Sequence, residues 1–199
     1  MKNQTNNGVT SLDVIGIGNA IVDVLVYAKD SLLESKALNK GNMTLINEAQ
    51  AEEIYTSMGP GLETSGGSAA NTLAGISLLG GKAGFIGRVK DDKLGRIFSD
   101  EITSTGTFYQ TPAITNGPST ARCLILVTPD TERTMCTYLG ASVFLDKKDL
   151  NLDVIQNSKI LYLEGYLFDT DAAKDAFFEA ANVAKNSNNK VALSLSDSF

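Results

Sequence analysis

The sequence predicts an α/β fold in which an incomplete doubly wound sheet carries a small, separate β-sheet. Short apolar, β-branched runs alternate with amphipathic helical patterns in the first half of the chain and again near its end, which is typical of a doubly wound sheet. Residues 107–139 instead offer only strand and turn patterns, which indicates a sheet outside that core. A last strand pattern at 191–195 has no helix after it, so we expect a truncated α/β domain.

The composition is that of an acidic globular protein. With 199 residues, 43% hydrophobic residues and a net charge of −6, the chain can bury a large core and lacks the clustered basic face of a nucleic-acid-binding protein. No apolar run approaches the ~20 residues of a membrane span. Residues 1–11 lack the apolar centre of a signal peptide. We therefore expect a cytoplasmic protein with no nucleic-acid or membrane partner.

Histidine is absent, and the two cysteines, Cys123 and Cys136, form no Cys-x-x-Cys pair. These absences exclude most zinc sites and every Ser-His or Cys-His catalytic pair. Any chemistry must therefore come from carboxylates, amides, hydroxyls or a diffusible metal ion. We assign no metal ligand and no catalytic residue to this chain.

The first predicted strand, residues 12–18, is a short β-branched run typical of a buried parallel strand. Its Gly16-Ile17-Gly18 end suggests a dinucleotide-binding loop, but Ile21 occupies the place of the third glycine and no helix follows. A second strand is predicted at 20–28, where Asp23 interrupts the apolar pattern. Its carboxylate either points to solvent or faces a ligand, where it would accept two hydrogen bonds from a vicinal diol.

Helix and strand patterns then alternate as far as residue 106. Asn47 and Gln50 form a predicted capping box at the start of a helix over 48–58. Asp91 or Asp92 is expected to cap an amphipathic helix that reaches residue 104. The other elements expected in this part are a short helix at 31–35, a strand at 41–46, a helix at 68–80 and a strand at 82–89.

Gly66 and Gly67 stand directly before the helix that begins at Ser68. Glycines here let the backbone approach a ligand closely and leave the first N–H groups of the helix free, so the turn is a candidate site for a hydroxyl-rich or anionic ligand. With Asp23 arriving from the small separate β-sheet, neutral hydroxyls are favoured over phosphate. Asn71 lies one turn into the helix, where asparagine is a poor helix former, and its amide either bonds the local backbone or reaches toward the helix start.

Residues 107–139 are predicted to form an antiparallel meander. Together with the strands at 20–28 and 43–46 it would make a small sheet, the lid, that closes over a pocket. The expected division of the chain is a lid of residues 20–47 and 107–139. The truncated α/β core would then comprise residues 1–19, 48–106 and 140–199.

A hairpin turn is predicted at 129–132, and it sets the relation of the two cysteines. If Thr128 faces Arg133, Cys123 and Cys136 are diagonal, with Cα atoms about 7–8 Å apart. A disulfide is disfavoured at that separation. Arg133 itself is either a solvated hairpin charge or points inward.

The last third of the chain again predicts core elements. A strand at 159–166 places Glu164 near its carboxyl end, the edge at which open α/β sheets bind ligands. A short helix or turn is expected at 146–150, an amphipathic helix at 169–186 and the last strand at 191–195.

Three groups of residues, taken in order, resemble the PfkB or ribokinase family of sugar and nucleoside kinases. They are Gly16-Ile17-Gly18-Asn19 with Asp23, Gly66-Gly67-Ser68 with Asn71, and Arg133-Thr134-Met135 after a hairpin. Gly-Gly-x-x-x-Asn alone is a weak signal, but the combined order extends along nearly the whole chain and is specific. The Asn19 to Asp23 spacing and the Arg-Thr-Met hairpin look most like the adenosine kinase branch.

The resemblance implies a ribokinase-like fold and a full-length enzyme that transfers the γ-phosphoryl group of ATP, with Mg²⁺, to a primary hydroxyl of a sugar or nucleoside. Asp23 would hold the sugar hydroxyls, and Arg133 would come down with the lid near the phosphate path. The lid commonly forms a dimer surface in relatives, so a homodimer through the lid is a further expectation. The substrate-binding residues that the resemblance implies are Asn19, Asp23, Gly66, Gly67, Asn71, Arg133, Glu164 and Tyr166.

One family feature is missing from the sequence. The Asp-Thr-x-Gly-Ala-Gly-Asp type of motif, which supplies the catalytic base and anion hole of the family, does not occur, and no Walker motif or kinase Gly-rich loop replaces it. Two hypotheses follow. The chain is the amino-terminal, substrate-binding part of an adenosine kinase-like enzyme and is inactive alone, or it is a non-catalytic substrate-binding or dimerisation module. The uncovered last strand favours the first.

Overall fold

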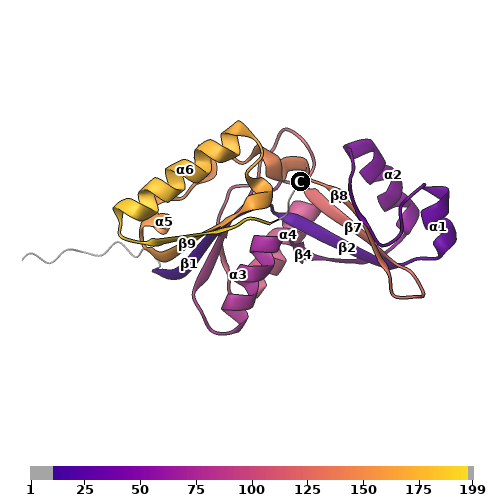
Figure 1. Cartoon of the computed structure of the whole chain (residues 1–199), viewed down its shortest axis with the longest axis horizontal. Helices are drawn as coiled ribbons and strands as arrows, with labels where there is room; N and C mark the ends of the chain where they lie inside the picture. The colour runs from indigo at the N-terminus through magenta and orange to yellow at the C-terminus, as the bar shows by residue number, and fades with distance from the viewer. Residues whose placement is uncertain (1–10, 197–199) are drawn as a thin grey trace, which may run out of the picture.

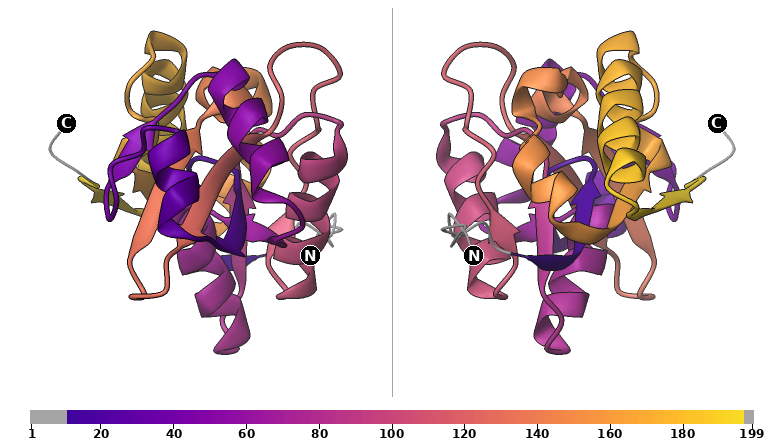
Figure 2. Two further views of the ribbon diagram at one scale, coloured as in Figure 1. Left: turned by 90° about the vertical axis from the view of Figure 1, so that its right-hand side faces the viewer. Right: turned by 90° about the vertical axis from the view of Figure 1, so that its left-hand side faces the viewer.

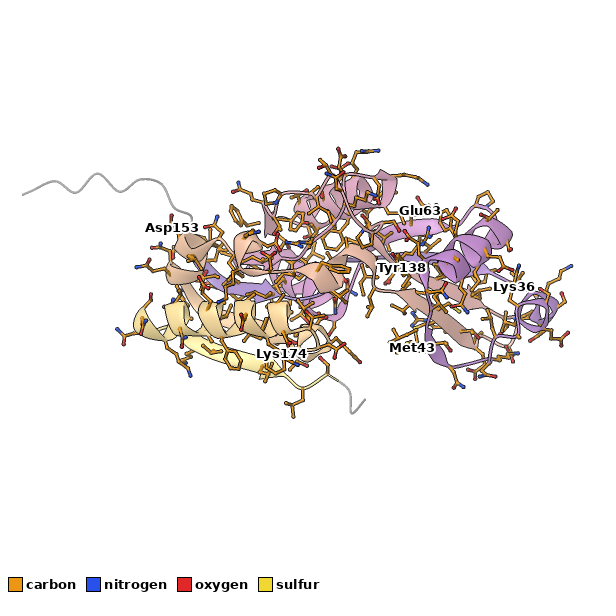
Figure 3. All side chains as sticks on the ribbon, turned by 90° about the horizontal axis from the view of Figure 1, so that it is seen from above. Lys36, Met43, Glu63, Tyr138, Asp153 and Lys174 are labelled. Atoms are coloured by element: carbon orange, nitrogen blue, oxygen red, sulfur yellow. The ribbon has the colours of Figure 1, made fainter. Side chains whose placement is uncertain are left out.

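The computed structural model describes residues 11–196, which fold into two five-stranded sheets. The strand orders are β10-β9-β1-β5-β6 in the core sheet and β3-β8-β7-β2-β4 in the lid sheet. Figure 1 labels β1 and β9 of the core sheet and β2, β4, β7 and β8 of the lid sheet. Seen from above, the lid residues Lys36 and Met43 lie toward one end of the molecule and the core residues Asp153 and Lys174 toward the other (Figure 3). Residues 1–10 and 197–199 lie outside the described residues. The prediction about a signal peptide concerned residues 1–11, so most of that segment is not described.

The core sheet is parallel throughout, as its β-branched sequences predict. β1 (Leu12–Ile17) lies at its centre, between β5 (Ala83–Ile86) and β9 (Ser158–Glu164). β6 (Phe108–Tyr109) and β10 (Lys190–Ser194) form the two edges. The carboxyl ends of β1, β9 and β10 therefore meet along one side of the sheet, where ligands of such sheets bind.

Helices cover both faces of the core sheet, which confirms the doubly wound prediction. α3 (Ser68–Leu78) and α4 (Lys93–Ser104) pack on the face of Val14 and Phe85. α5 (Leu152–Gln156) and α6 (Asp171–Asn186) pack on the opposite face, that of Ile15 and Leu161. Asp92 caps α4 by accepting a hydrogen bond from the Gly95 N–H at 2.8 Å. The short helices are η1 (Gly140–Phe144), η2 (Lys147–Asp149) and η3 (Gly165–Leu167).

The lid sheet is mixed, and the expected antiparallel meander is wrong. β2 (Ile21–Tyr27) runs parallel to β7 (Ala121–Val127) and antiparallel to β4 (Leu62–Gly66). β8 (Arg133–Tyr138) pairs antiparallel with β7 and parallel with β3 (Met43–Leu45). β2 and β7 are parallel because each is the first strand entered after the chain crosses from the core sheet into the lid.

One face of the lid sheet is covered by α1 (Asp30–Ser35) and α2 (Glu48–Met58), which stand in front of the sheet in the left view of Figure 2. The Asn47 and Gln50 capping box forms as predicted, and α2 has the predicted bounds. Alternate residues of β2, beginning with Val22, enter an apolar core that also holds Phe98 of α4. The lid and the core sheet therefore share one hydrophobic core.

Two strands lie in a different sheet from the one expected. β4 belongs to the lid sheet, although residues 48–106 were assigned to the core, and β6 belongs to the core sheet, although residues 107–139 were assigned to the lid. β4 has the polar sequence Leu-Glu-Thr-Ser-Gly, which shows no apolar strand pattern. Most of its residues are exposed or half-buried. Backbone pairing with β2 holds it at the edge.

The β7–β8 hairpin turns where predicted, but its register is one residue away from the predicted one. Val127, and not Thr128, faces Arg133, because the Thr128 N–H donates to the Glu132 carbonyl inside the turn. Cys123 then faces Thr137 and Cys136 faces Leu124. Adjacent strand positions point to opposite faces of a sheet, so the two thiols lie on opposite faces of the lid sheet. Both cysteines are free, which confirms that no disulfide joins them.

Within residues 11–196, no helix is both long and apolar enough to span a membrane.

Candidate functional site

A cavity of about 620 Å³ lies between the lid sheet and the carboxyl ends of the core strands. The lid contributes the side of its sheet that faces away from α1 and α2. The core contributes the residues that follow β1, β9 and β10 and the first turn of α3. The lining residues are Asn19, Ile21, Asp23, Met43, Leu45, Gly67, Ser68, Asn71, Cys123, Met135, Thr137, Leu139, Glu164, Gly165, Tyr166, Phe168, Asp169, Leu195 and Ser196.

Most of the predicted site residues meet at this cavity, and two, Gly66 and Arg133, lie outside its lining. Those that line it are Asn19, Asp23, Gly67, Asn71, Glu164 and Tyr166. Gly66 lies directly behind Asp23. Arg133 is exposed at the start of β8 and shares the cavity-facing side of that strand with Met135 and Thr137.

Asp23 is the carboxylate that the lid presents to the cavity. It is half-buried in β2, between Cys123 of β7 and Thr64 of β4. Burial raises the pKa of its carboxyl group, and the positive charge of Arg133 opposes that rise. None of the described residues forms a hydrogen bond with the Asp23 carboxylate, so both of its oxygens are available to a ligand.

The two glycines before α3 are needed for close packing. A Cβ atom on Gly66 would lie 2.4 Å from Cγ of Asp23, so only glycine leaves room for that carboxylate. Gly67 has φ +101°, in the region that favours glycine, and a Cβ atom there would lie 2.4 Å from the carbonyl oxygen of Asn19. Glycine at both places therefore brings the β1–β2 and β4–α3 connections into contact.

Asn19 and Glu164 form a buried hydrogen-bonded pair at the base of the cavity. Oε1 of Glu164 accepts hydrogen bonds from the backbone N–H of Asn19 at 3.2 Å and from its Nδ2 at 3.1 Å. Oε2 accepts from the backbone N–H of Ala69 at 2.6 Å. Burial raises the pKa of Glu164, while the hydrogen bonds from Ala69 and Asn19 act in the opposite direction.

The start of α3 is therefore occupied differently from the sequence prediction. We expected its first N–H groups to be free for a ligand, but the Ala69 N–H donates to Glu164 of the same chain. Sequence reasoning could not find this contact, because the two residues lie 95 positions apart. A carboxylate at a helix N-terminus is electrostatically favourable, so an anionic ligand gains little at this place.

Asn71 and Tyr166 lie at the more open part of the cavity. Asn71 is exposed on α3, and its side chain forms no hydrogen bond with the described residues, so the local backbone bond considered above does not form. Tyr166 lies in η3 and is 40% exposed. Its backbone N–H donates to Oγ of Ser196 at 3.1 Å, which joins η3 to the chain after β10.

The lid wall of the cavity is largely apolar and rich in sulfur, which the sequence analysis did not predict. The apolar side chains of this wall are Ile21, Met43, Leu45, Cys123 and Met135. Burial raises the pKa of the Cys123 thiol to about 11, and the Thr137 hydroxyl donates to its sulfur at 3.4 Å. An apolar wall opposite the polar first turn of α3 suits a ligand with one flat apolar part and one hydroxyl-bearing part.

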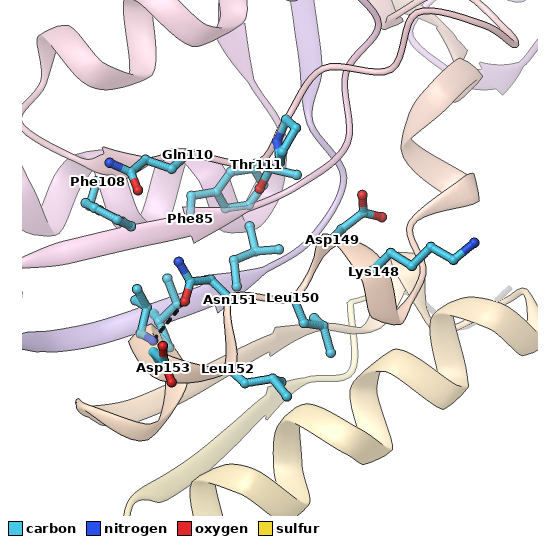
Figure 4. Close-up of a pocket in the computed structure, with 14 residues that line it drawn as sticks. Phe85, Phe108, Gln110, Thr111, Lys148, Asp149, Leu150, Asn151, Leu152 and Asp153 are labelled. Atoms are coloured by element: carbon cyan, nitrogen blue, oxygen red, sulfur yellow. Dashed lines mark hydrogen bonds between the residues drawn. The ribbon is translucent and has the colours of Figure 1, made fainter. Parts of the chain in front are cut away.

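A second cavity, of about 460 Å³, lies beside β5 and β6. Gln110 and Thr111 border it on one side and residues 148–153 on the other (Figure 4). It holds none of the predicted site residues. A third, of about 400 Å³, is lined mainly by apolar residues around Leu139 and Phe144.

The ATP and Mg²⁺ that the resemblance implies do not fit the described residues by themselves. Within residues 11–196, no group of three Asp, Glu, Cys or His side chains is close enough to hold a metal ion. The sequence offers no phosphate-binding glycine motif. We therefore derive no reaction step through either group for this chain.

Comparisons with known proteins agree with the fold. The family described as pfkB family carbohydrate kinase matches residues 48–199. The structure superposes on an adenosine kinase from Sinorhizobium meliloti with TM-score 0.84 and 49% identity, and on a probable sugar kinase from Rhizobium etli with TM-score 0.85 and 45% identity. Each comparison covers 94% of this chain and 57% of the other.

A curated relative is more distant. Probable fructokinase-2 of Arabidopsis thaliana is 27% identical over 163 residues, which are 77% of this chain and 50% of the relative. The chain thus spans about half the length of this relative. Because the family match covers more than half of the chain and the sequence and fold agree with it, the chain belongs to the pfkB family of carbohydrate kinases.

Proposed function

We propose that this chain is the substrate-binding part and lid of an ATP-dependent kinase that phosphorylates a primary hydroxyl of a nucleoside, with adenosine as the first candidate. The observation that carries the proposal is the Asp23 carboxylate, which faces the cavity with both oxygens free of hydrogen bonds from the described residues. A carboxylate in this state can accept hydrogen bonds from two neighbouring hydroxyl groups of a ribose.

The other cavity residues support binding of the same group. Asn71 is an exposed amide one turn into α3, on the core side of the cavity. It can donate and accept hydrogen bonds with ribose hydroxyls. The lid wall would pack on a flat base, and closure of the lid over the ligand would exclude water from the reacting hydroxyl. Arg133 supplies positive charge near Asp23.

A nucleoside is favoured over a hexose for two reasons. A hexose carries hydroxyl groups all round its ring, and the apolar lid wall would leave those that face it without partners. The relative that is 49% identical is described as an adenosine kinase, whereas the fructokinases are 26–30% identical. A ligand screen by thermal unfolding should show stabilisation by adenosine and a smaller shift with fructose.

We further propose that this chain alone has negligible turnover. It carries no Asp-Thr-x-Gly-Ala-Gly-Asp type of motif, so it lacks the base and the anion hole that ATP-dependent transfer requires. The test is an assay of ATP-dependent phosphorylation of adenosine and of several sugars. It compares this chain with the natural gene product extended beyond Phe199. Equal activity of the two proteins would overturn the proposal.

A second candidate function is a non-catalytic binding or dimerisation module. It is supported by the exposed edge strand β3, where Leu45 is 52% exposed. Analytical ultracentrifugation of the wild type and of Leu45→Glu tests a homodimer through the lid. A monomeric wild type would rule that dimer out.

A further inference from the structure

Glu164 is the most deeply buried carboxylate at the candidate site. It is the last residue of β9 and is 1% exposed. None of the ion pairs among residues 11–196 involves it. Its charge is instead held by three N–H groups, two from Asn19 and one from Ala69. A buried carboxylate is tolerated only when hydrogen-bond donors surround it in this way.

The three donors lie at two of the connections that join the core to the lid. Asn19 lies where the chain leaves β1 for β2, and Ala69 lies just after the chain returns from β4 to α3. Glu164 comes from a third element, β9. Its two oxygens therefore join three parts of the chain that approach each other only in the folded state.

Small residues enclose the Glu164 carboxylate. A Cβ atom on Gly18 would lie 2.5 Å from Oε2 of Glu164 and 2.9 Å from Cβ of Ala69. Both oxygens are already bonded, and three of the roughly four acceptor positions of the carboxylate are occupied by N–H groups of this chain. Oδ1 of Asn19, in contrast, is buried and has no hydrogen-bond partner among the described residues.

We infer that Glu164 is a positioning residue for substrate binding: its carboxylate holds Asn19 and the first turn of α3 in place and makes no contact with the substrate. The inference rests on the proposed function, because it concerns the ligand bound in the same cavity. It differs from the role that the family resemblance implies, in which Glu164 or Tyr166 borders the substrate.

Two substitutions disturb the carboxylate in different ways. Glu164→Gln keeps the shape but replaces one acceptor oxygen by an NH₂ group, which must then face a donor, since all three partners are N–H groups. Gly18→Ala keeps the charge and displaces the carboxylate by contact. Gly75→Ala is the matched control, because a Cβ atom at Gly75 of α3 meets nothing within 4 Å.

The binding experiment uses adenosine, 2′-deoxyadenosine and 3′-deoxyadenosine with the wild type and the three variants, in isothermal titration calorimetry. A positioning role predicts that Glu164→Gln and Gly18→Ala each weaken binding of all three ligands by the same factor, about tenfold, which corresponds to loss of one hydrogen bond of about 1.4 kcal/mol. Gly75→Ala should bind as the wild type does. A loss that disappears for one of the deoxy ligands would show direct contact with the missing hydroxyl and overturn the inference.

Amide hydrogen exchange gives a second readout that needs no ligand. The backbone N–H groups of Asn19 and Ala69 should exchange faster in Glu164→Gln and Gly18→Ala than in the wild type and Gly75→Ala. Unchanged exchange at both amides would overturn the inference. If the wild type binds no nucleoside or sugar, the proposed function fails, and the exchange rates still decide whether Glu164 holds these two segments. If Glu164→Gln does not fold, Gly18→Ala carries both measurements.

Discussion

Substitution of Asp23 by asparagine should stabilise the ligand-free protein and weaken nucleoside binding. The Asp23 carboxyl has a pKa raised by burial, so the folded state favours its protonated form. The stability that this carboxyl group contributes is present when the pH is below its ordinary pKa of 3.8, and it is lost as the pH rises through the pKa of the folded state. At pH 7 the ionised group therefore opposes folding, and asparagine removes that opposition.

The effect on binding follows from the two free oxygens of Asp23. A hydrogen bond to a charged group contributes about 1.5–3 kcal/mol. Asparagine keeps one neutral acceptor, so we expect a loss of about 3 kcal/mol, or roughly 100-fold in affinity. At a ligand concentration 100 times the wild-type Kd, the wild type gains about 2.7 kcal/mol of stability from the ligand. The variant should gain only about 0.4 kcal/mol.

The assay is urea unfolding at pH 7 with and without adenosine. Asp100→Asn is the control, since Asp100 is an exposed acid of α4 that does not line the cavity. It should match the wild type in both conditions. The reasoning fails if adenosine stabilises Asp23→Asn as much as the wild type, or if the ligand-free variant is less stable than the wild type.

Three further predictions concern the same site. Gly67→Ala should lower the free energy of unfolding by about 2 kcal/mol, because the alanine would have to adopt φ +101° and its Cβ atom would lie 2.4 Å from the Asn19 carbonyl oxygen. An unchanged urea midpoint would contradict this. Nucleoside affinity should fall as the pH drops through the folded pKa of Asp23, which lies above 3.8, and calorimetry between pH 7 and pH 4 checks it; affinity independent of pH in that range would count against Asp23 as the acceptor. The buried thiol of Cys123, with a pKa of about 11, should react with an aromatic disulfide reagent at pH 7 only after unfolding; fast labelling of the native protein is the opposing result.

Local patterns in the sequence were enough to predict the core. β1, β9 and β10 follow from β-branched apolar runs, and α2 and α4 follow from capping residues such as Asn47 and Asp92. β4 could not be predicted, because it is held in the sheet by backbone pairing with β2 and not by burial of apolar side chains. The parallel pairing of β2 with β7 depends on how the chain crosses between the sheets, which periodicity does not encode.

The candidate site was predictable in its polar part. Asp23 stood out because it interrupts an apolar strand, and Gly66 and Gly67 because they precede a helix. The lid wall was not predictable, since Met43 and Met135 become neighbours only through the pairing of β3 with β8. The role of Glu164 was also hidden, because its partners Asn19 and Ala69 are distant in sequence.

The parallel pairing of β2 with β7 has a consequence for folding kinetics. It joins Ile21 to Ala121, residues about 100 positions apart, so the lid sheet is built from contacts of high sequence separation. Such contacts close large loops and form slowly. During synthesis β2 can pair with β4 early, but its pairing with β7 must wait until β7 has left the ribosome. Pulse-labelled hydrogen exchange during refolding should show the amides of β2 and β7 gaining protection together and later than those of α4. The lid would then be the last part of the chain to become native.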